Sequence, residues 1–139
     1  ELYVEGLEVR RAIVREFGCT PESLRNVSIS LDRVADTMHR LGLATIDEMG
    51  QPRTPLELYV EGLEVRRAIV REFGRTPESL RDLFVSGCKM STADFANAKS
   101  WLNFAKEQLQ EIIDRGWNDA QTPNDLSWVN FRLADLSDQ

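Results

Sequence analysis

Several kinds of chemistry are scarce or missing in this sequence of 139 residues. It has one histidine, His39, and two cysteines, Cys19 and Cys88, which are too few for a disulfide framework and lack metal-ligand spacing. It has no glycine-rich phosphate loop, no nucleophile elbow and no paired metal-binding histidines. We therefore expect a protein that is not an enzyme and that takes no cofactor, metal or small-molecule substrate.

Long apolar runs are also missing. No stretch approaches the length that crosses a bilayer, and the first residues, ELYVE, have neither the basic nor the apolar region of a signal peptide. We therefore expect a cytoplasmic protein with no membrane partner. Acidic residues outnumber basic ones by 23 to 17, and the net charge of −6 favours solubility and opposes diffuse attraction to nucleic acid.

The sequence does contain a nearly identical internal duplication. Residues 1–27, ELYVEGLEVRRAIVREFGCTPESLRNV, recur at 57–83 as ELYVEGLEVRRAIVREFGRTPESLRDL. Three positions differ: Cys19 against Arg75, Asn26 against Asp82, and Val27 against Leu83. The similarity ends abruptly after each copy, so the pattern is not that of a solenoid, which needs three or more similar units.

The duplication has two interpretations. Each copy supplies the same helix pair to one of two related subdomains, or the two copies compete for one docking site, as in a two-state or domain-swapping protein. Natural tandem use and engineered duplication fit the sequence equally well. The Cys19–Arg75 difference adds the hypothesis of a disulfide between Cys19 and Cys88, although we favour two reduced thiols.

Each copy is predicted to form a helix, a tight corner and a short second helix. Apolar residues recur at helical spacing along one side of the first helix. They are Leu2, Val9, Ile13 and Phe17 in the first copy and Leu58, Val65, Ile69 and Phe73 in the second. Gly18 and Gly74 are expected to end this helix in the left-handed conformation, and the Thr-Pro-Glu triplets at 20–22 and 76–78 to start the next.

The segments after the copies differ from each other. After the first copy, a short helix at 21–26 is expected to stop, and Ser30 to cap a new helix that ends at Gly42. A short hairpin with strands near 43–46 and 53–58 should follow. After the second copy, Ser91 or Thr92 is predicted to cap a long helix that runs to Arg115.

The C-terminal helices are predicted to carry an interaction face. The apolar residues of the long helix follow alternating steps of three and four, which is typical of helical bundles. A final amphipathic helix at 123–136 is expected to close the bundle or dock a partner. The predicted face consists of Phe95, Trp101, Leu102, Leu109, Leu126, Val129 and Leu133.

Residues 8–58 run through VRRAIVREFG, TPESLRN, SLDRVADTMHRLGL and LATIDEMGQPRTPLEL, in the order helix, short helix, helix, hairpin. This order resembles the winged-helix branch of the helix-turn-helix superfamily, over about a third of the chain. The resemblance implies a third helix in the DNA major groove and a wing beside it. It would place Ser30, Arg33, Thr37, His39 and Arg40 toward DNA, with Arg53 at the wing tip.

Clustered positive charge occurs once in each copy. Arg10, Arg11 and Arg15 share a broad helix face that phosphates would fit. The interpretation we favour is pairing with neighbouring glutamates as surface ion pairs.

We therefore expect an all-α fold, mostly a helical bundle, with one short β-hairpin near 43–58. Residues 1–56 would hold the first copy, its third helix and the wing, and 57–139 the second copy with helices at 93–115 and 123–136, around one shared core. The function we expect is a non-enzymatic, self-associating, DNA-associated regulator or assembly subunit of winged-helix type. The alternative is a protein-interaction or scaffold module, or an engineered duplication, without DNA binding.

Overall fold

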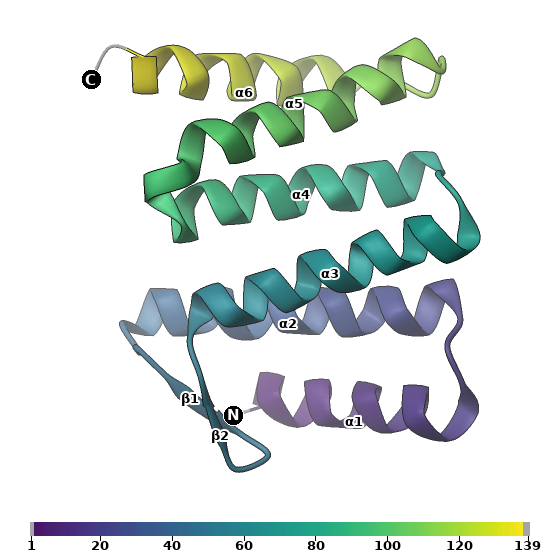
Figure 1. Cartoon of the computed structure of the whole chain (residues 1–139), viewed down its shortest axis with the longest axis vertical. Coiled ribbons are helices and arrows are strands. Elements are labelled where there is room, and N and C mark those ends of the chain that lie inside the picture. Colours follow the sequence, from purple (N-terminus) through teal and green to yellow (C-terminus); the bar gives the residue numbers. More distant parts are fainter. Residues whose placement is uncertain (1, 138–139) are drawn as a thin grey trace. The chain divides into compact units, whose positions relative to one another are not determined.

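A computed structural model describes the backbone of residues 2–137 and, except at residues 2–4 and 17, their side chains. Figure 1 shows that this part of the chain is almost entirely helical, with one small hairpin. The elements are α1 (Leu2–Phe17), α2 (Pro21–Leu41), β1 (Ile46–Glu48), β2 (Gln51–Arg53), α3 (Pro55–Phe73), α4 (Pro77–Ala93), the 3₁₀ helix η1 (Phe95–Asn97), α5 (Ala98–Asp114) and α6 (Thr122–Ser137). The expected mostly helical fold with one short hairpin is confirmed.

The chain divides into two compact units, Glu1–Gly74 and Arg75–Gln139. This boundary lies inside the second copy, so α3 belongs to the first unit and α4 to the second. The sequence repeat predicts a boundary after residue 56, where the second copy begins. In the structure α3 packs on α2, so the first unit extends to Gly74. The shared core stays a prediction.

In the first unit, α2 packs against both α1 and α3. The first helices of both copies are therefore docked at the same time, on one central helix. The buried apolar side chains are Leu7, Val27, Leu31, Val34, Ala35, Met38, Leu58, Tyr59, Leu63 and Ile69.

In the second unit, α5 packs against both α4 and α6. Gly87 of α4 lies so close to α5 that an added Cβ would stand 3.0 Å from the Cβ of Ala105. The buried apolar side chains are Leu80, Leu83, Phe84, Met90, Ala98, Leu102, Ala105, Leu109, Ile112 and Val129.

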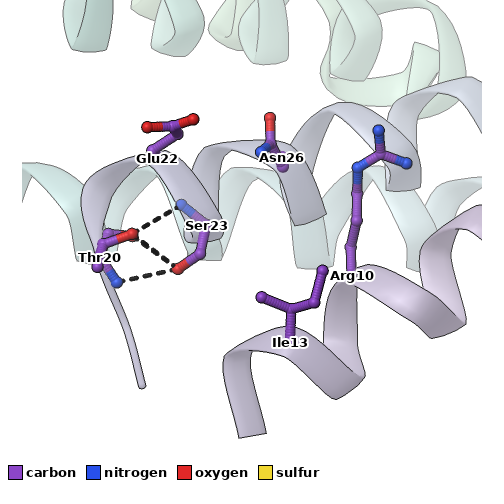
Figure 2. Close-up of a pocket in the computed structure, with 6 residues that line it drawn as sticks. All are labelled: Arg10, Ile13, Thr20, Glu22, Ser23 and Asn26. Carbon is purple, nitrogen blue, oxygen red and sulfur yellow. Dashed lines mark hydrogen bonds between the residues drawn. The ribbon is translucent and has the colours of Figure 1, made fainter. Parts of the chain in front are cut away.

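The corner inside each copy has the predicted local structure. Thr20 and Thr76 are N-caps: each hydroxyl accepts a hydrogen bond of 3.0 Å from the backbone N–H of a serine three residues later, Ser23 and Ser79. Each serine hydroxyl accepts in return from the threonine N–H, which completes a capping box. Figure 2 shows the box formed by Thr20 and Ser23. Gly18 and Gly74 have positive φ angles of 90° and 89°, as predicted.

Gly74 differs from the prediction in one respect. Its ψ of 173° puts it outside the left-handed helical region. This combination of angles is open essentially only to glycine, so the residue type is explained although the predicted cap conformation is wrong.

The predicted break between residues 26 and 30 is absent, because α2 is one helix from Pro21 to Leu41. Ser28 lies inside it, and its hydroxyl donates to the carbonyl oxygen of Arg25 at 2.7 Å. Ser30 is buried inside the same helix. Because neither glycine nor proline interrupts this segment and Val27, Leu31 and Val34 form one buried stripe, the serines do not act as caps. The two helices that the winged-helix order separates are thus joined.

The helix predicted at 93–115 is also wrong at its start. Ser91 is buried within α4, where its hydroxyl donates to the carbonyl oxygen of Cys88, and α4 continues to Ala93. A 3₁₀ turn intervenes before α5 begins at Ala98. The helix α4 continues through Gly87. The missing side chain of this glycine lets α4 pack closely on α5.

The hairpin lies within the predicted region, but its strands are three residues each, at 46–48 and 51–53. The turn is Met49-Gly50, with φ angles of 53° and 80°, which is the two-residue turn that suits the twist of a hairpin. Pro52, which lies outside the strands expected near 43–46 and 53–58, pairs with Asp47; proline is tolerated there because both strands of a two-stranded sheet are edges.

The apolar stripe predicted for the two copies holds only in part. Ile69 is 7% exposed, whereas Ile13 at the same position of the first copy is 43% exposed and Val9 is 60% exposed. Leu58 is buried, and Phe73 is exposed. The side chains of Leu2 and Phe17 lie outside the described residues. Identical sequences therefore have different surroundings in the two copies.

Candidate functional site

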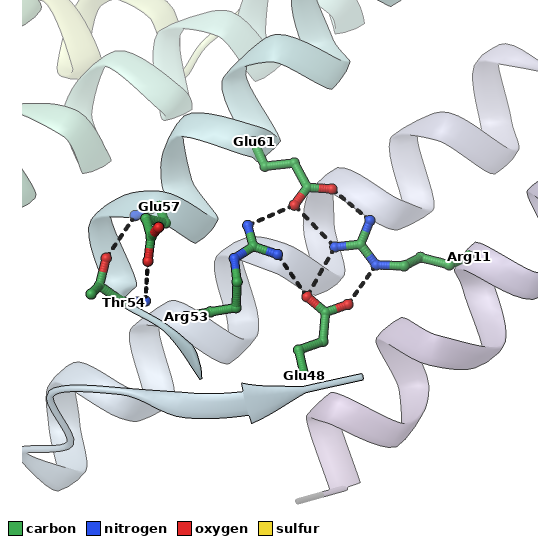
Figure 3. Close-up of polar contacts among 6 residues, drawn as sticks. All are labelled: Arg11, Glu48, Arg53, Thr54, Glu57 and Glu61. Carbon is green, nitrogen blue, oxygen red and sulfur yellow. Dashed lines mark hydrogen bonds and ion pairs between the residues drawn. The ribbon is translucent and has the colours of Figure 1, made fainter. Parts of the chain in front are cut away.

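A polar cluster of the first unit joins three parts of the fold. Arg11 comes from α1, Glu48 from β1, Arg53 from β2 and Glu61 from α3, and Figure 3 shows the four side chains converging. We call these four residues the arginine–glutamate ring. The tight Met49-Gly50 turn positions Glu48 and Arg53 on paired strands, while Arg11 and Glu61 come from the first and second copies.

Each glutamate of the ring binds both arginines. Arg11 donates from Nε to Glu48 Oε2 at 2.7 Å and from Nη1 to Glu61 Oε2 at 2.5 Å. Arg53 donates from Nη1 to Glu48 Oε1 and from Nη2 to Glu61 Oε1, both at 2.8 Å. Glu48 is only 5% exposed, so the ring is partly removed from water. Two positive and two negative groups give it no net charge.

The surroundings shift the pKa values of two ring residues, Glu61 and Arg11. Burial acts to raise the pKa of Glu61, but hydrogen bonds and charges of Arg11 and Arg53 outweigh it and lower the pKa below its ordinary value. The pKa of Arg11 is raised, first by its hydrogen bond to Glu61 and against the opposing effect of burial. Both shifts favour the charged forms of Glu61 and Arg11.

A shallow hollow of about 380 Å³ lies over the ring, lined also by Met49, Gln51, Pro52 and Glu57. Glu57 is occupied in the capping box of Thr54 at the start of α3. Because every guanidinium of the ring already faces two carboxylates, the hollow offers no unpaired positive group to a phosphate. The arrangement is a clamp that ties α1, the hairpin and α3 together.

Two of the residues predicted to contact DNA, Arg11 and Arg53, thus belong to the ring. Ser30, also predicted to face DNA, is buried in α2. The remaining predicted residues are at least partly accessible: Arg10, Arg15, Arg33, Thr37, His39 and Arg40. The structure does not bring all nine together on one exposed surface, because Ser30 is buried and the guanidinium groups of Arg11 and Arg53 are paired in the ring.

The predicted interaction face on the C-terminal helices is also divided. Leu102, Leu109 and Val129 are fully buried, so they hold the second unit together and are unavailable to a partner. Leu126 and Leu133 are half-buried on α6. Trp101 donates from Nε1 to Asp94 Oδ2 at 3.0 Å, and Phe95 is exposed in η1.

Sequence reasoning missed an exposed aromatic pair on α6. Trp128 is 42% and Phe131 is 69% exposed, while Val129 between them is fully buried. The signal was present, because aromatic residues three apart share a helix face and this face differs from that of Leu126, Val129 and Leu133. The guanidinium of Arg132 lies 5.7 Å from the centre of the Trp128 ring.

The two cysteines carry free thiols. Cys19 is exposed in the corner of the first copy, and Cys88 is mostly buried in α4 of the second unit. Burial and, next, the charge of Asp125 raise the pKa of Cys88 to about 12. The disulfide hypothesis stays a prediction.

No protein-family model, curated protein or solved structure matches the chain. Within the part of the chain that the structure describes, no group of three or more histidine, cysteine, aspartate or glutamate side chains is arranged to hold a metal ion. None of the described helices is both long and apolar enough to span a membrane.

Proposed function

We propose that the chain is a protein-interaction module that self-associates through α6. The observation that carries the proposal is the pair Trp128 and Phe131, exposed one helical turn apart. Exposed aromatic residues that share a face mark interaction surfaces, because burying each ring removes a large apolar area from water. Arg132 adds a cation beside this face, a residue type enriched at interfaces.

Sedimentation velocity over a range of concentrations tests the proposal. We expect the sedimentation coefficient to rise with concentration for the unaltered chain, and the Trp128→Ser, Phe131→Ser double variant to stay monomeric. Leu41→Ser is a matched control, since Leu41 is 62% exposed but lies on α2 in the first unit. A chain that is monomeric at every concentration, or association that the double variant retains, would contradict the proposal.

A DNA-associated regulator is the second candidate. Arg33, Thr37 and Arg40 favour it, because spacings of four and seven residues put them on one face of α2, where both arginines are exposed. The neutralised arginines of the ring weigh against it, and the continuous α2 removes the turn that the winged-helix resemblance requires.

Fluorescence anisotropy with a labelled mixed-sequence duplex tests this candidate. DNA binding would appear at low salt, weaken steeply as salt rises, and fall in the Arg33→Ala, Arg40→Ala variant. The Arg67→Ala, Arg71→Ala variant is a control for the same charge change at exposed positions of α3. Absence of binding at low ionic strength removes the DNA candidate.

A further inference from the structure

Two helices of the second unit carry the same short motif of tryptophan, an apolar residue, asparagine and phenylalanine. It reads WLNF at 101–104 in α5 and WVNF at 128–131 in α6. In both helices the apolar residue, Leu102 or Val129, is fully buried. The surroundings of the motif in α5 therefore indicate which kind of surface fits the motif in α6.

In α5 the motif packs on α4, which runs in the opposite direction (Figure 1). A Cβ added to Gly87 of α4 would lie 3.1 Å from Cδ2 of Phe104 and 3.2 Å from the carbonyl oxygen of Trp101. The indole N–H of Trp101 donates to Oδ2 of Asp94, the C-cap of α4, at 3.0 Å. A carboxylate at the C-terminal end of an antiparallel helix thus accepts from the tryptophan of the motif.

In α6 both aromatic residues of the motif are exposed. The indole N–H of Trp128 has no hydrogen-bond acceptor among the residues that the structure describes. Asn124 and Asp135 are also exposed, and residues 124, 128, 131 and 135 follow one another at steps of four, three and four. This spacing puts the four side chains on one stripe, as in the seam of a two-stranded coiled coil. We call these four residues the α6 seam.

We propose that the α6 seam packs antiparallel on the α6 seam of a second copy, with the indole N–H of Trp128 donating to the carboxylate of Asp135 in that copy. This inference rests on the proposed self-association through α6 and specifies the direction of the partner helix and its polar contact. Pairing Trp128 with Phe131 of the second copy brings Asn124 beside Asp135. A tryptophan on a helix leans toward the N-terminus of that helix, so the indole reaches the same level.

A second copy fits because the seam is complementary to itself. It contains an aromatic pair and, one turn further on, the carboxylate that the tryptophan of the motif binds in α5. Two-fold symmetry then forms each contact twice, since the same surface patch acts on both copies.

Charge at the ends of α6 favours the antiparallel direction. The last described turn of α6 holds Asp135 and no basic residue, so a carboxylate lies at the negative end of the helix dipole. In an antiparallel pair each Asp135 lies near the positive end of the other α6, where Asp125 is already paired with Arg81. In a parallel pair the two Asp135 side chains would face each other, and the two Trp128 side chains would occupy one layer.

Chemical cross-linking tests the direction of the pair. Asn124→Cys and Ala134→Cys are made separately in a chain that carries Cys19→Ser, and one variant is labelled with heavy nitrogen for mass spectrometry. Cys88 is retained, because burial raises its pKa to about 12 and makes the thiol slow to react. We expect a short bismaleimide to link one variant to the other in the mixture. Each variant alone should cross-link little, since identical positions lie about two to three helical turns apart in an antiparallel pair.

A double-mutant cycle tests the polar contact. Sedimentation velocity compares association of the unaltered chain, Asp135→Ala, Trp128→Phe and the variant with both changes. We expect Asp135→Ala to weaken association roughly tenfold, because both hydrogen bonds of the symmetric pair are lost. Its effect should be clearly smaller when Trp128→Phe has already removed the donor. Asp47→Ala, which removes an exposed carboxylate of the first unit, is the matched control, and circular dichroism confirms the helical content of each variant.

Cross-links of each variant with itself, in place of the mixed product, would overturn the inference but leave the proposed self-association standing. Equal effects of Asp135→Ala with and without Trp128→Phe would do the same. A mixed cross-link that persists when Trp128→Ser and Phe131→Ser are added would show that the pair forms without the seam, which also overturns the inference. A chain that is monomeric at every concentration would overturn the proposed function and the inference with it.

Discussion

Identical residues of the two copies differ in what they contact. Arg11 binds two glutamates in a partly buried ring, whereas Arg67, its counterpart in the second copy, is exposed and pairs with Glu64 one helical turn away. An exposed pair of this kind contributes at most about 1 kcal/mol, while a buried charge that loses its partner is far more costly. The hairpin that supplies Glu48 and Arg53 is the feature that distinguishes the first copy.

Glu48→Gln should lower the free energy of unfolding by about 2–3 kcal/mol, because Arg11 and Arg53 each lose one of two charged acceptors in a site with little water. Urea denaturation followed by far-ultraviolet circular dichroism measures the change. Glu64→Gln is the matched control and should stay within about 0.5 kcal/mol, since Glu64 is exposed. Equal effects of the two variants would show that the ring adds nothing to stability.

The ring should also make stability depend on pH. The pKa of Glu61 is lower in the folded chain than its ordinary value, so its contribution is complete above the ordinary pKa and is lost as pH falls through the lowered one. We expect Glu61→Gln to be less stable than the unaltered chain at pH 7, with the difference shrinking between about pH 5 and pH 3. Urea midpoints at several pH values test this, and a constant difference over that range would contradict it.

The two thiols should react at very different rates. Because the pKa of Cys88 is raised to about 12 by burial, its thiolate fraction at pH 8 is on the order of 10⁻⁴, and its access is limited as well. Ellman's reagent should modify Cys19 at least about 100-fold faster than Cys88 in the folded chain. Cys19→Ser should remove the fast phase only. Two fast thiols would refute the burial of Cys88, and two thiols that appear only after reduction would establish the disulfide.

At the scale of elements, the corners and the helix ends at Gly18, Gly42 and Gly74 could be predicted from the sequence, whereas the helix starts could not where a serine was taken as the cap. Gly18, Thr20 and Ser23 satisfy one another within six residues, so the local sequence specifies their structure. Ser30 and Ser91 look like caps locally, but both are buried inside helices. What decides their place is burial of the neighbouring apolar stripe, which depends on contacts distant in sequence.

Glycine in the middle of a helix has opposite meanings at two positions. An added Cβ at Gly87 would stand 3.0 Å from the Cβ of Ala105 and 3.2 Å from the carbonyl oxygen of Trp101, atoms that cannot easily move. Among the atoms that the structure describes, the only one near Gly6 is the end of the flexible Arg10 side chain. Packing therefore requires glycine at residue 87, whereas no described atom of another element requires it at residue 6.

Gly87→Ala should therefore destabilise the chain by about 1–2 kcal/mol, since overpacking outweighs the better helix propensity of alanine. Gly6→Ala, the same substitution in an open place, should stabilise it by up to about 1 kcal/mol. Urea denaturation compares the two directly, with tryptophan fluorescence for Gly87 because the three tryptophans all lie in the second unit. Effects of the same sign would show that the packing of α4 on α5 does not control residue 87.

At the scale of the whole molecule, the sequence repeat and the folded units do not coincide. The ring shows why the partners of the arginines could not be predicted from the sequence: Arg11 binds Glu48 and Glu61, which are 37 and 50 residues away. No periodicity within a helix reports such partners. Composition and local pattern predicted the helical class and the hairpin, whereas the placement of charged groups required the tertiary structure.

The position of the unit boundary gives a test at this scale. Residues 1–74 should unfold cooperatively in urea, because they keep α3, with Leu58 and Leu63 in the core, Glu61 in the ring and Arg66 on Asp32. Residues 1–56, which end where the repeat predicts a boundary, lack these four α3 residues. In this fragment Arg66 no longer binds Asp32, and the side of α2 that packs on α3 is exposed to water. We expect low helicity and a broad transition for 1–56, and a sharp one for 1–74, by circular dichroism on monomeric samples. Equally sharp transitions would mean that α1, α2 and the hairpin fold without α3. The boundary of the repeat would then also be the boundary of the folding unit.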